Sequence, residues 1–341
     1  MKTRVFVLLL SCLLLTGCAF PGQQTEKRYT ATFLTLFDTV TTIVGFDESE
    51  EAFSQKTQKI HDELLRYHQL FDIYNSYEGI NNLKTLNDAA GGDPVVVDKS
   101  IIALLKSCKE YYALTGGRVN AAMGSVLKLW HDARSDGYDD PANAALPDEK
   151  ALQEAAKHTD FDDVIIDEAA STVRIADPYL RLDVGAIAKG WATQRVAERM
   201  PAGLLISVGG NVCATGPKDE KGTPWVVGIQ DPGNINENLH TLNITAGSVV
   251  TSGDYQRAYA VDGKLYHHII DPDTLYPSTY WRSVTVVCGD SGLADALSTA
   301  LFLLSREDGQ ALLDRCDAKA LWVDGNGSIF YSPGFEAMIR S

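Results

Sequence analysis

Asp295 and Thr299 lie four residues apart in the segment Ala294–Ala300. Side chains with this spacing share one face of a helix. A carboxylate beside a hydroxyl offers two hard oxygen ligands, which suit Mg²⁺ when water and phosphate complete its coordination. A structural interpretation is also open, because an acidic side chain is favourable in the first turn of a helix and a threonine hydroxyl can bond to its own helix.

Two neighbouring histidines, His267 and His268, precede an apolar pair and Asp271. Adjacent residues of a strand point to opposite faces, so the two rings are not expected to share one site. One ring is expected to be solvated or packed in the core, whereas the other is a candidate general base. Strand neighbours chelate a metal poorly, so we prefer acid–base chemistry to metal binding.

A glycine turn follows Asp183 and joins an expected strand to an amphipathic helix. Backbone N–H groups at a helix start attract phosphate, and Lys189 adds positive charge there. A P-loop is excluded, because Trp191 and Ala192 stand where that motif requires Lys and Ser or Thr. Alone, the turn is more typical of a structural strand-to-helix connection.

The elements that position these groups follow from residue periodicity. The pattern predicts helices over Glu50–Phe71, Ser100–Thr115, Gly124–Ala133, Asp148–Ala156, Leu293–Leu304 and Arg306–Leu313. It predicts strands over Thr30–Phe46, Val164–Ile166, Thr172–Ile175, Leu204–Val208, Trp225–Gln230, Thr241–Thr245, Val249–Thr251 and Val284–Val287. Asp262-Gly263 predicts a hairpin over Tyr259–Tyr266. Grouped strands and hairpins favour an α+β fold with largely antiparallel sheets flanked by helices.

The N-terminal segment has the pattern of an export signal. Lys2 and Arg4 precede the apolar run Val5–Leu15, which is shorter than the ~20 residues of a membrane-spanning helix. Leu15-Thr-Gly-Cys18 is typical of a bacterial lipoprotein cleavage site. Residues 1–17 are therefore expected to be a lipoprotein signal peptide, with residues 18–29 as a lipidated cysteine and tether. The alternative is an ordinary secretory signal with a chance cysteine.

Composition limits the partners. The 341 residues carry a formal net charge of −15, which becomes −17 without residues 1–17, because these hold two basic residues and no acid. This charge argues against nucleic acid and against docking on anionic lipid by charge. Four scattered cysteines without CxxC spacing argue against a zinc site and favour buried thiols, and a disulfide stays open. They are Cys108, Cys213, Cys288 and Cys316.

Five segments follow one another in a fixed order. They are Asp183–Ala192, Ile206–Asn211, Thr251–Tyr255, His268–Pro272 and Ala294–Ala300. Their order resembles the ApbE family, the FAD:protein FMN transferases, and the resemblance extends from about residue 30 to about residue 333. It implies that residues 30–341 form a catalytic domain of the ApbE-like flavin transferase fold. With the export signal, it also implies an extracytoplasmic enzyme, anchored by lipid on the periplasmic or cell-surface side of a bacterial membrane.

The resemblance implies a magnesium-dependent reaction. The FMN half of FAD moves to a Thr hydroxyl of an acceptor flavoprotein, expected to be membrane-associated, and AMP leaves. It implies Mg²⁺ at Asp295, Thr299 and the Ala186 carbonyl, with Ser298 close by, and His268 as the base. The implied FAD contacts are Asp183, Lys189, Ile269, Phe37, Tyr74, Arg118, Val119 and Asn120.

The sequence departs from the family pattern in three places. Phe37-Asp38-Thr39 replaces a frequent Met-Gly-Thr, Arg118-Val119-Asn120 replaces a common Ala-Phe-Asp, and Leu275 stands where Gly is usual. The residues of the metal site are intact, so transfer is the expected activity. An FAD pyrophosphatase, in which water takes the acceptor's place, is an alternative that uses the same residues. A second alternative is a non-enzymatic flavin-binding lipoprotein, and the intact His268, Asp295 and Thr299 argue against it.

Overall fold

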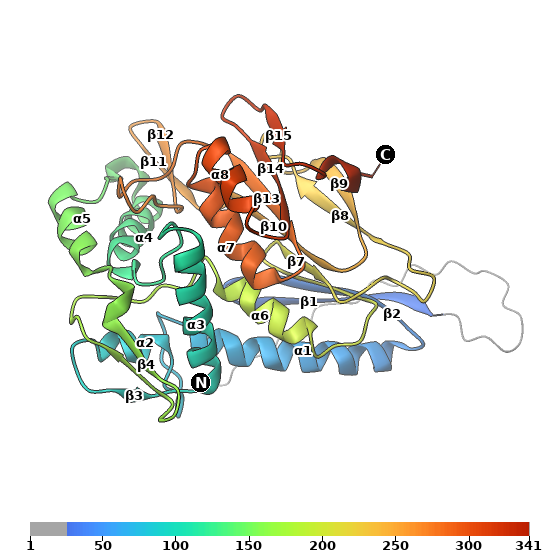
Figure 1. Cartoon of the computed structure of the whole chain (residues 1–341), viewed down its shortest axis with the longest axis horizontal. Helices are drawn as coiled ribbons and strands as arrows, with labels where there is room; N and C mark the ends of the chain where they lie inside the picture. Colours follow the sequence, from blue (N-terminus) through green and yellow to red (C-terminus); the bar gives the residue numbers. More distant parts are fainter. Residues whose placement is uncertain (1–25, 341) are drawn as a thin grey trace, which may run out of the picture.

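A computed structural model describes residues 26–340 of the chain (Figure 1). The expected signal peptide and Cys18 lie outside these residues. None of the helices in the described part is both long and apolar enough to cross a membrane. The first strand begins at Lys27, so it reaches into the segment 18–29 that was expected to be a tether.

An antiparallel sheet of eight strands forms the centre of the molecule. Its strands, in spatial order, are β1 (Lys27–Leu36), β2 (Thr39–Asp47), β6 (Leu204–Val208), β7 (Asn211–Ala214), β10 (Gly247–Gly253), β13 (Ser283–Cys288), β14 (Ala318–Val323) and β15 (Ile329–Tyr331). Successive residues of these strands face opposite sides. Val250 belongs to the main apolar core, whereas its neighbour Val249 belongs to a second core on the other face.

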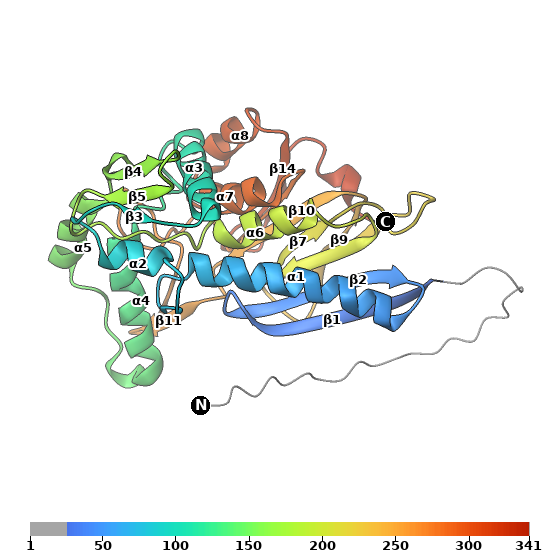
Figure 2. The same ribbon diagram turned by 90° about the horizontal axis from the view of Figure 1, so that it is seen from below.

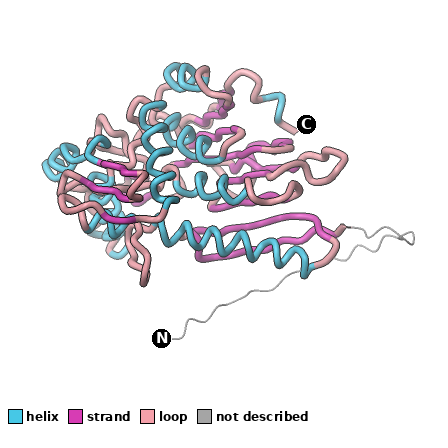
Figure 3. The backbone as a smooth tube through the Cα atoms, turned by 60° about the horizontal axis from the view of Figure 1, so that its bottom comes forward, coloured by secondary structure: helices cyan, strands magenta, loops and turns pink. Residues whose placement is uncertain are grey.

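Three helices cover the main-core face of this sheet. They are α1 (Glu50–Phe71), α6 (Ala188–Ala197) and α7 (Ser291–Phe302), which lie side by side in Figures 1 and 2. The opposite face is covered by a hairpin of β8 (Trp225–Gln230) and β9 (Asn238–Ile244), through Trp225 and Leu242. Figure 3 shows the helical and strand layers separately, as expected when each element buries one apolar side.

The remaining elements gather at one end of the sheet (Figure 2). The helices there are α2 (Leu83–Asp88), α3 (Lys99–Leu114), α4 (Gly124–Asp139) and α5 (Glu149–Ala155), while α8 (Arg306–Leu313) packs on α7. Two small antiparallel sheets complete the fold, β3 (Val95–Val96) with β5 (Thr172–Ile175) and β4 (Val164–Asp167), and β11 (Ala258–Val261) with β12 (Lys264–His267). The α+β class with largely antiparallel sheets is confirmed.

Most expected elements are present, with one informative error. Thr30–Phe46 was expected to be one strand, but the chain reverses at Phe37 and Asp38 and forms the β1–β2 hairpin. Both turn residues have φ near 52°, a conformation in which glycine is normally favoured. Because neither residue is a glycine, this turn could not be predicted from the sequence. The sequence also did not indicate α2, β3, β7, β14 or β15, and α4 runs six residues beyond its expected end at Ala133.

Candidate functional site

Most of the expected site residues line one cavity of about 560 Å³. It lies where the Asp183 turn, helix α7, the loop after β12 and the N-terminal end of α4 meet. Asp183, Lys189, His268 and Asp295 all line it, although they are up to 112 residues apart in the chain. A smaller cavity of about 150 Å³ adjoins the first one. The two share Asp38, Tyr74, Asp183, Gly185, Lys189 and Arg257.

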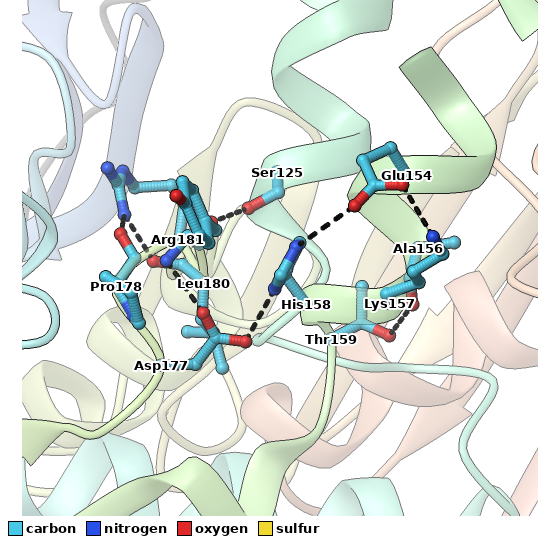
Figure 4. A network of polar contacts seen from close by, with 11 residues as sticks. Ser125, Glu154, Ala156, Lys157, His158, Thr159, Asp177, Pro178, Leu180 and Arg181 are labelled. Atoms are coloured by element: carbon cyan, nitrogen blue, oxygen red, sulfur yellow. Dashed lines mark hydrogen bonds and ion pairs between the residues drawn. The ribbon is translucent and has the colours of Figure 1, made fainter. Parts of the chain in front are cut away.

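Hydrogen bonds to several parts of the fold hold the segment before Asp183 in place. Figure 4 shows the polar network around it: His158 Nδ1 lies 2.7 Å from Asp177 Oδ2, and Ser125 Oγ donates to the Tyr179 carbonyl at 2.5 Å. Asp183 N–H donates to the Ala121 carbonyl at 2.8 Å. The Asp183 carboxylate accepts from Gly185 N–H at 2.8 Å. These contacts fix the turn that carries Asp183 into the cavity.

Helices α6 and α7 approach each other closely at Gly190. Its N–H donates to Asp295 Oδ2 at 2.8 Å. A Cβ added at Gly190 would lie 2.3 Å from the Ser291 carbonyl oxygen and 2.5 Å from the Asp295 Cβ, so only glycine fits. Burial raises the pKa of Asp295, and the positive charge of Lys189 opposes that shift.

Asp295 does not occupy the first turn of its helix, contrary to expectation. Asp290 is the N-cap of α7 and accepts from Leu293 N–H at 2.8 Å, so Asp295 lies in the second turn. Its carboxylate is therefore not needed for capping, which removes the structural alternative stated for it. Thr299 lies one turn further on and lines the same cavity.

The Ala186 carbonyl lies at the start of α6. Ala186 precedes the first helical residue, Ala188, and lines the cavity. Gly190 is the third residue of α6, so its N–H has no acceptor within the helix and donates to Asp295 instead. Ser298 is placed differently from the other expected metal residues. It is fully buried, its hydroxyl donates to the Asp295 carbonyl at 2.9 Å, and it lies 2.8 Å from Ser252 Oγ. Ser298 therefore supports Asp295 from within the helix and does not line the cavity.

The two histidines separate as expected, although only His267 belongs to a strand, because β12 ends there. His267 Nε2 lies 2.7 Å from the Ser278 carbonyl, which accepts its proton, and the ring packs edge-on against Phe302. His268 lines the cavity, and its buried Nδ1 has no hydrogen-bond partner within residues 26–340. Desolvation, helped by the charge of Arg257, lowers the pKa of His268 to about 3. The ring is therefore neutral at physiological pH and can accept a proton.

The remaining expected FAD contacts line the same two cavities, but their side chains have different neighbours. Tyr74 and the buried side chains of Val119 and Ile269 line the main cavity. Arg118 also lines it and pairs with Asp273 at 2.6 Å. A further lining residue, Asn120, has both ends of its amide engaged, donating to the Thr159 carbonyl and accepting from Ala122 N–H, each at 2.8 Å. Phe37 lines only the smaller cavity.

Helix α4 contributes a face that sequence reasoning missed. Leu127, Trp130, His131 and Arg134 recur at intervals of three and four residues, and all four line the cavity. His131 stacks on Tyr74 with ring centroids 5.1 Å apart, and Arg134 Nη2 lies 3.1 Å from His131 Nδ1. The spacing was readable in the sequence, but only the fold shows that this face is turned to the cavity.

The four cysteines within the described residues carry free thiols. Cys108, Cys213 and Cys288 are buried, and Cys316 is half-buried. Clusters of three or more His, Cys, Asp or Glu side chains suited to a metal ion do not occur among residues 26–340. A metal at this site would consequently rest on one carboxylate together with hydroxyl and carbonyl oxygens, a donor set that excludes soft metals.

Comparison with known proteins gives the family. The sequence profile of the ApbE family matches residues 37–322. An FAD:protein FMN transferase of Treponema pallidum is 39% identical over 249 residues, which is 68% of this chain and 67% of that protein. One of Klebsiella pneumoniae is 34% identical over 285 residues, which is 80% of this chain and 86% of that protein.

Solved structures agree with this assignment. The crystal structure of the ApbE protein of Thermotoga maritima superposes with a TM-score of 0.80 at 29% identity, covering 92% of this chain and all of that one. The fold is thus that of the ApbE proteins. The chain belongs to the ApbE family and is a flavin transferase.

Proposed function

We propose that this protein transfers the FMN half of FAD to a threonine hydroxyl of an acceptor protein and releases AMP. The observation that carries the proposal is the shared cavity. Asp295, Thr299 and Ala186 lie on its wall together with the neutral His268 and the cationic Lys189. Phosphoryl transfer depends on positioning and charge neutralisation more than on covalent help, and this set supplies both.

The oxygen donors of the cavity wall fit Mg²⁺. They are the Asp295 carboxylate, the Thr299 hydroxyl and the Ala186 carbonyl, and all three residues line the cavity. Hard oxygens of this kind are the ligands that Mg²⁺ prefers, and it usually shares them with phosphate and water. Mg²⁺ bound there would neutralise charge on the pyrophosphate of FAD. Ser298 would hold Asp295 in place and would not be a ligand.

The protein's own residues account for the proton and the orientation. The threonine oxygen forms a bond to the FMN phosphorus, the bond from that phosphorus to the AMP oxygen breaks, and His268 accepts the hydroxyl proton. Lys189, Arg134 and Arg257 line the cavity and face the region of His268, where their charges would hold the pyrophosphate. Arg257 forms no ion pair within residues 26–340, so its charge is available.

Mass spectrometry of an acceptor tests this function. The protein is incubated with FAD, Mg²⁺ and a threonine-bearing acceptor, and a matched acceptor with Thr→Ala serves as the control. The expected result is an FMN adduct on the threonine with an equal amount of AMP. Release of FMN and AMP at the same rate without an acceptor would show a pyrophosphatase instead. Unchanged FAD would indicate a flavin-binding protein.

We also propose that the enzyme is anchored outside the cytoplasm by lipid on Cys18. The Leu15-Thr-Gly-Cys18 pattern and the preceding apolar run support this. The anchor would favour acceptors in or near the same membrane. Membrane fractionation of the full chain and of Cys18→Ala tests it. The wild-type protein is expected in the membrane fraction and the variant in the soluble fraction, and equal partitioning would refute the anchor.

A further inference from the structure

The turn between β1 and β2 forms part of the cavity wall although it is strained. Phe37 and Asp38 both have φ of 52°, which a side chain on Cβ disfavours. Asp38 lines both cavities, and the next residue, Thr39, lines the larger one. A turn of two non-glycine residues in this conformation persists only when neighbouring groups hold it.

One side of this turn is held by the backbone of the sheet. Gly209 N–H donates to the Val40 carbonyl at 3.0 Å. A Cβ on Gly209 would lie 2.7 Å from Thr39 Oγ1, so glycine at this position lets the turn pack against the strand end. This contact fixes Thr39 and Val40, but it does not reach Phe37.

The other side is held by His68 near the C-terminal end of α1. Phe37 N–H donates to His68 Nδ1 at 3.1 Å, and the two rings meet edge to face with centroids 5.7 Å apart. Because Nδ1 accepts, the ring proton resides on Nε2, which lies 3.4 Å from Tyr77 Oη. His68 is thereby oriented as a hydrogen-bond acceptor for the turn.

Tyr77 and Asp72 continue these hydrogen bonds from His68 to Tyr74. Tyr77 O–H donates to Asp72 Oδ2 at 2.7 Å, and Asp72 Oδ1 accepts from Tyr74 N–H at 2.6 Å. Burial and the bond to Asp72 raise the pKa of Tyr77, so the phenol keeps its proton. The hydrogen bonds thus run from the turn to Tyr74, which lines both cavities.

We infer that His68 is a positioning residue for the flavin nucleotide. It holds the Phe37–Asp38 turn by accepting from Phe37 N–H. Through Tyr77 and Asp72 it also holds the Tyr74 backbone in place relative to that turn. His68 lines the smaller cavity, and its hydrogen bonds go to Phe37 and Tyr77 and not to the expected metal residues or His268, so its effect falls on binding and not on the chemical step. The inference rests on the proposed binding of FAD in this cavity. It also explains how the chain tolerates Phe37-Asp38 where the family often has Met-Gly.

Two substitutions separate the hydrogen bond from the packing of the ring. His68→Phe keeps an aromatic ring and removes the acceptor, whereas His68→Asn keeps an acceptor near the position of Nδ1 and removes the ring. The dissociation constant for FAD is measured by flavin fluorescence. We expect a roughly five- to tenfold increase for His68→Phe, the effect of one lost hydrogen bond, with kcat unchanged. For His68→Asn we expect a change of less than about twofold.

Amide hydrogen exchange gives a second readout. The Phe37 amide is expected to be protected in the wild type and in His68→Asn, and to exchange faster in His68→Phe. His61→Phe serves as the matched control on the same helix, because His61 packs on Phe33 and lines neither cavity. Tyr77→Phe is expected to weaken FAD binding in the same direction by a smaller factor, and it tests the hydrogen-bond chain if His68→Phe does not fold.

Several outcomes would overturn the inference. Unchanged FAD binding in both His68→Phe and Tyr77→Phe would do so. Weaker binding in His68→Asn than in His68→Phe would assign the role to ring packing instead. If the wild-type protein itself bound no FAD, the proposed function would fail and not the role of His68.

Discussion

The cavity has two walls that are held in different ways. The helical wall is formed by the Asp183 turn, α6 and α7, where backbone and buried side chains meet without space for a methyl group at Gly190. The turn wall is formed by Phe37–Thr39 and Tyr74, where an exposed hairpin turn is tied down by side-chain hydrogen bonds. His268 lines the same cavity from the loop after β12.

This difference matches what each wall would have to do. Ligands of a small cation must be fixed closely, because magnesium tolerates little deviation from octahedral geometry. Close packing of two helices gives that rigidity. A wall that contacts a large nucleotide needs only a stable position, which a few hydrogen bonds supply. We therefore expect substitutions in the helical wall to have larger effects than those in the turn wall.

The largest effect is expected for Asp295→Asn. The amide keeps the shape of the side chain and an oxygen that can accept from Gly190 N–H, but it removes the charge that would hold Mg²⁺. We expect FMN transfer to fall on the order of 10²- to 10³-fold, with a melting temperature within a few degrees of the wild type. Thermal unfolding and initial rates measured over a series of Mg²⁺ concentrations check this. Normal turnover would show that Asp295 holds no metal.

Gly190→Ala tests the packing of the helical wall directly. The added Cβ would lie 2.3 Å from the Ser291 carbonyl oxygen, so α6 and α7 must separate. We expect the free energy of unfolding to fall by about 2–3 kcal/mol, together with a loss of transfer as Asp295 moves. Urea unfolding measures the change. Gly325→Ala is the control, because a Cβ there meets nothing within 4 Å. Equal stability of the two variants would contradict this account of the wall.

The burial of the His268 ring predicts that the stability of the protein depends on pH. The pKa of His268 is lowered to about 3 in the folded state, below the ordinary value of 6.5. The unfolded chain therefore binds the proton more readily, so this group's contribution to stability is present above pH 6.5 and is lost as the pH falls toward 3. We expect wild type to lose about 1–2 kcal/mol more than His268→Gln between pH 7 and pH 5. Urea unfolding at both pH values measures this, and parallel losses would show that the ring is not desolvated.

The smallest effect is expected for Asp38→Gly in the turn wall. Glycine adopts the left-handed conformation without the steric cost of a Cβ, so the free energy of unfolding should rise by up to about 1 kcal/mol. FAD binding is expected to stay within about twofold, because the His68 contact to Phe37 is retained. Asp262→Gly, at another φ of 52° in the β11–β12 hairpin, is the control. Loss of FAD binding in Asp38→Gly alone would show that the turn wall is as intolerant as the helical wall.

Local patterns in the sequence predicted a large part of this molecule. Helix α1 begins and ends at the expected residues, because its apolar spacing and its Ser49 cap are local features. The Asp262-Gly263 hairpin and the separation of His267 from His268 were also predictable, since both follow from neighbouring residues. The missed strands β7 and β15 have only four and three residues, whereas β14 has six, and the sheet that these strands join decides their conformation.

The site residues were likewise predictable only where local spacing identified them. Asp295 and Thr299 were identified from their spacing, but the reason that Ser298 does not line the cavity is its bond to the Asp295 carbonyl and its contact with Ser252. The face of α4 and the role of Arg257 were missed, because nothing local indicates which side of a helix or loop meets a cavity. Asn120 was expected to contact FAD, yet its amide is used to hold the backbone.

By itself the sequence determined the α+β class, the order of the motifs and the types of oxygen, imidazole and cationic groups available, because these depend on residue identity and local spacing. Only the tertiary structure decided which groups meet. The close approach of α6 and α7 brings Asp295 to Gly190 N–H, 105 residues away in the chain, and His68 holds a turn 31 residues away. Such contacts depend on the packing of distant segments, which no local pattern encodes.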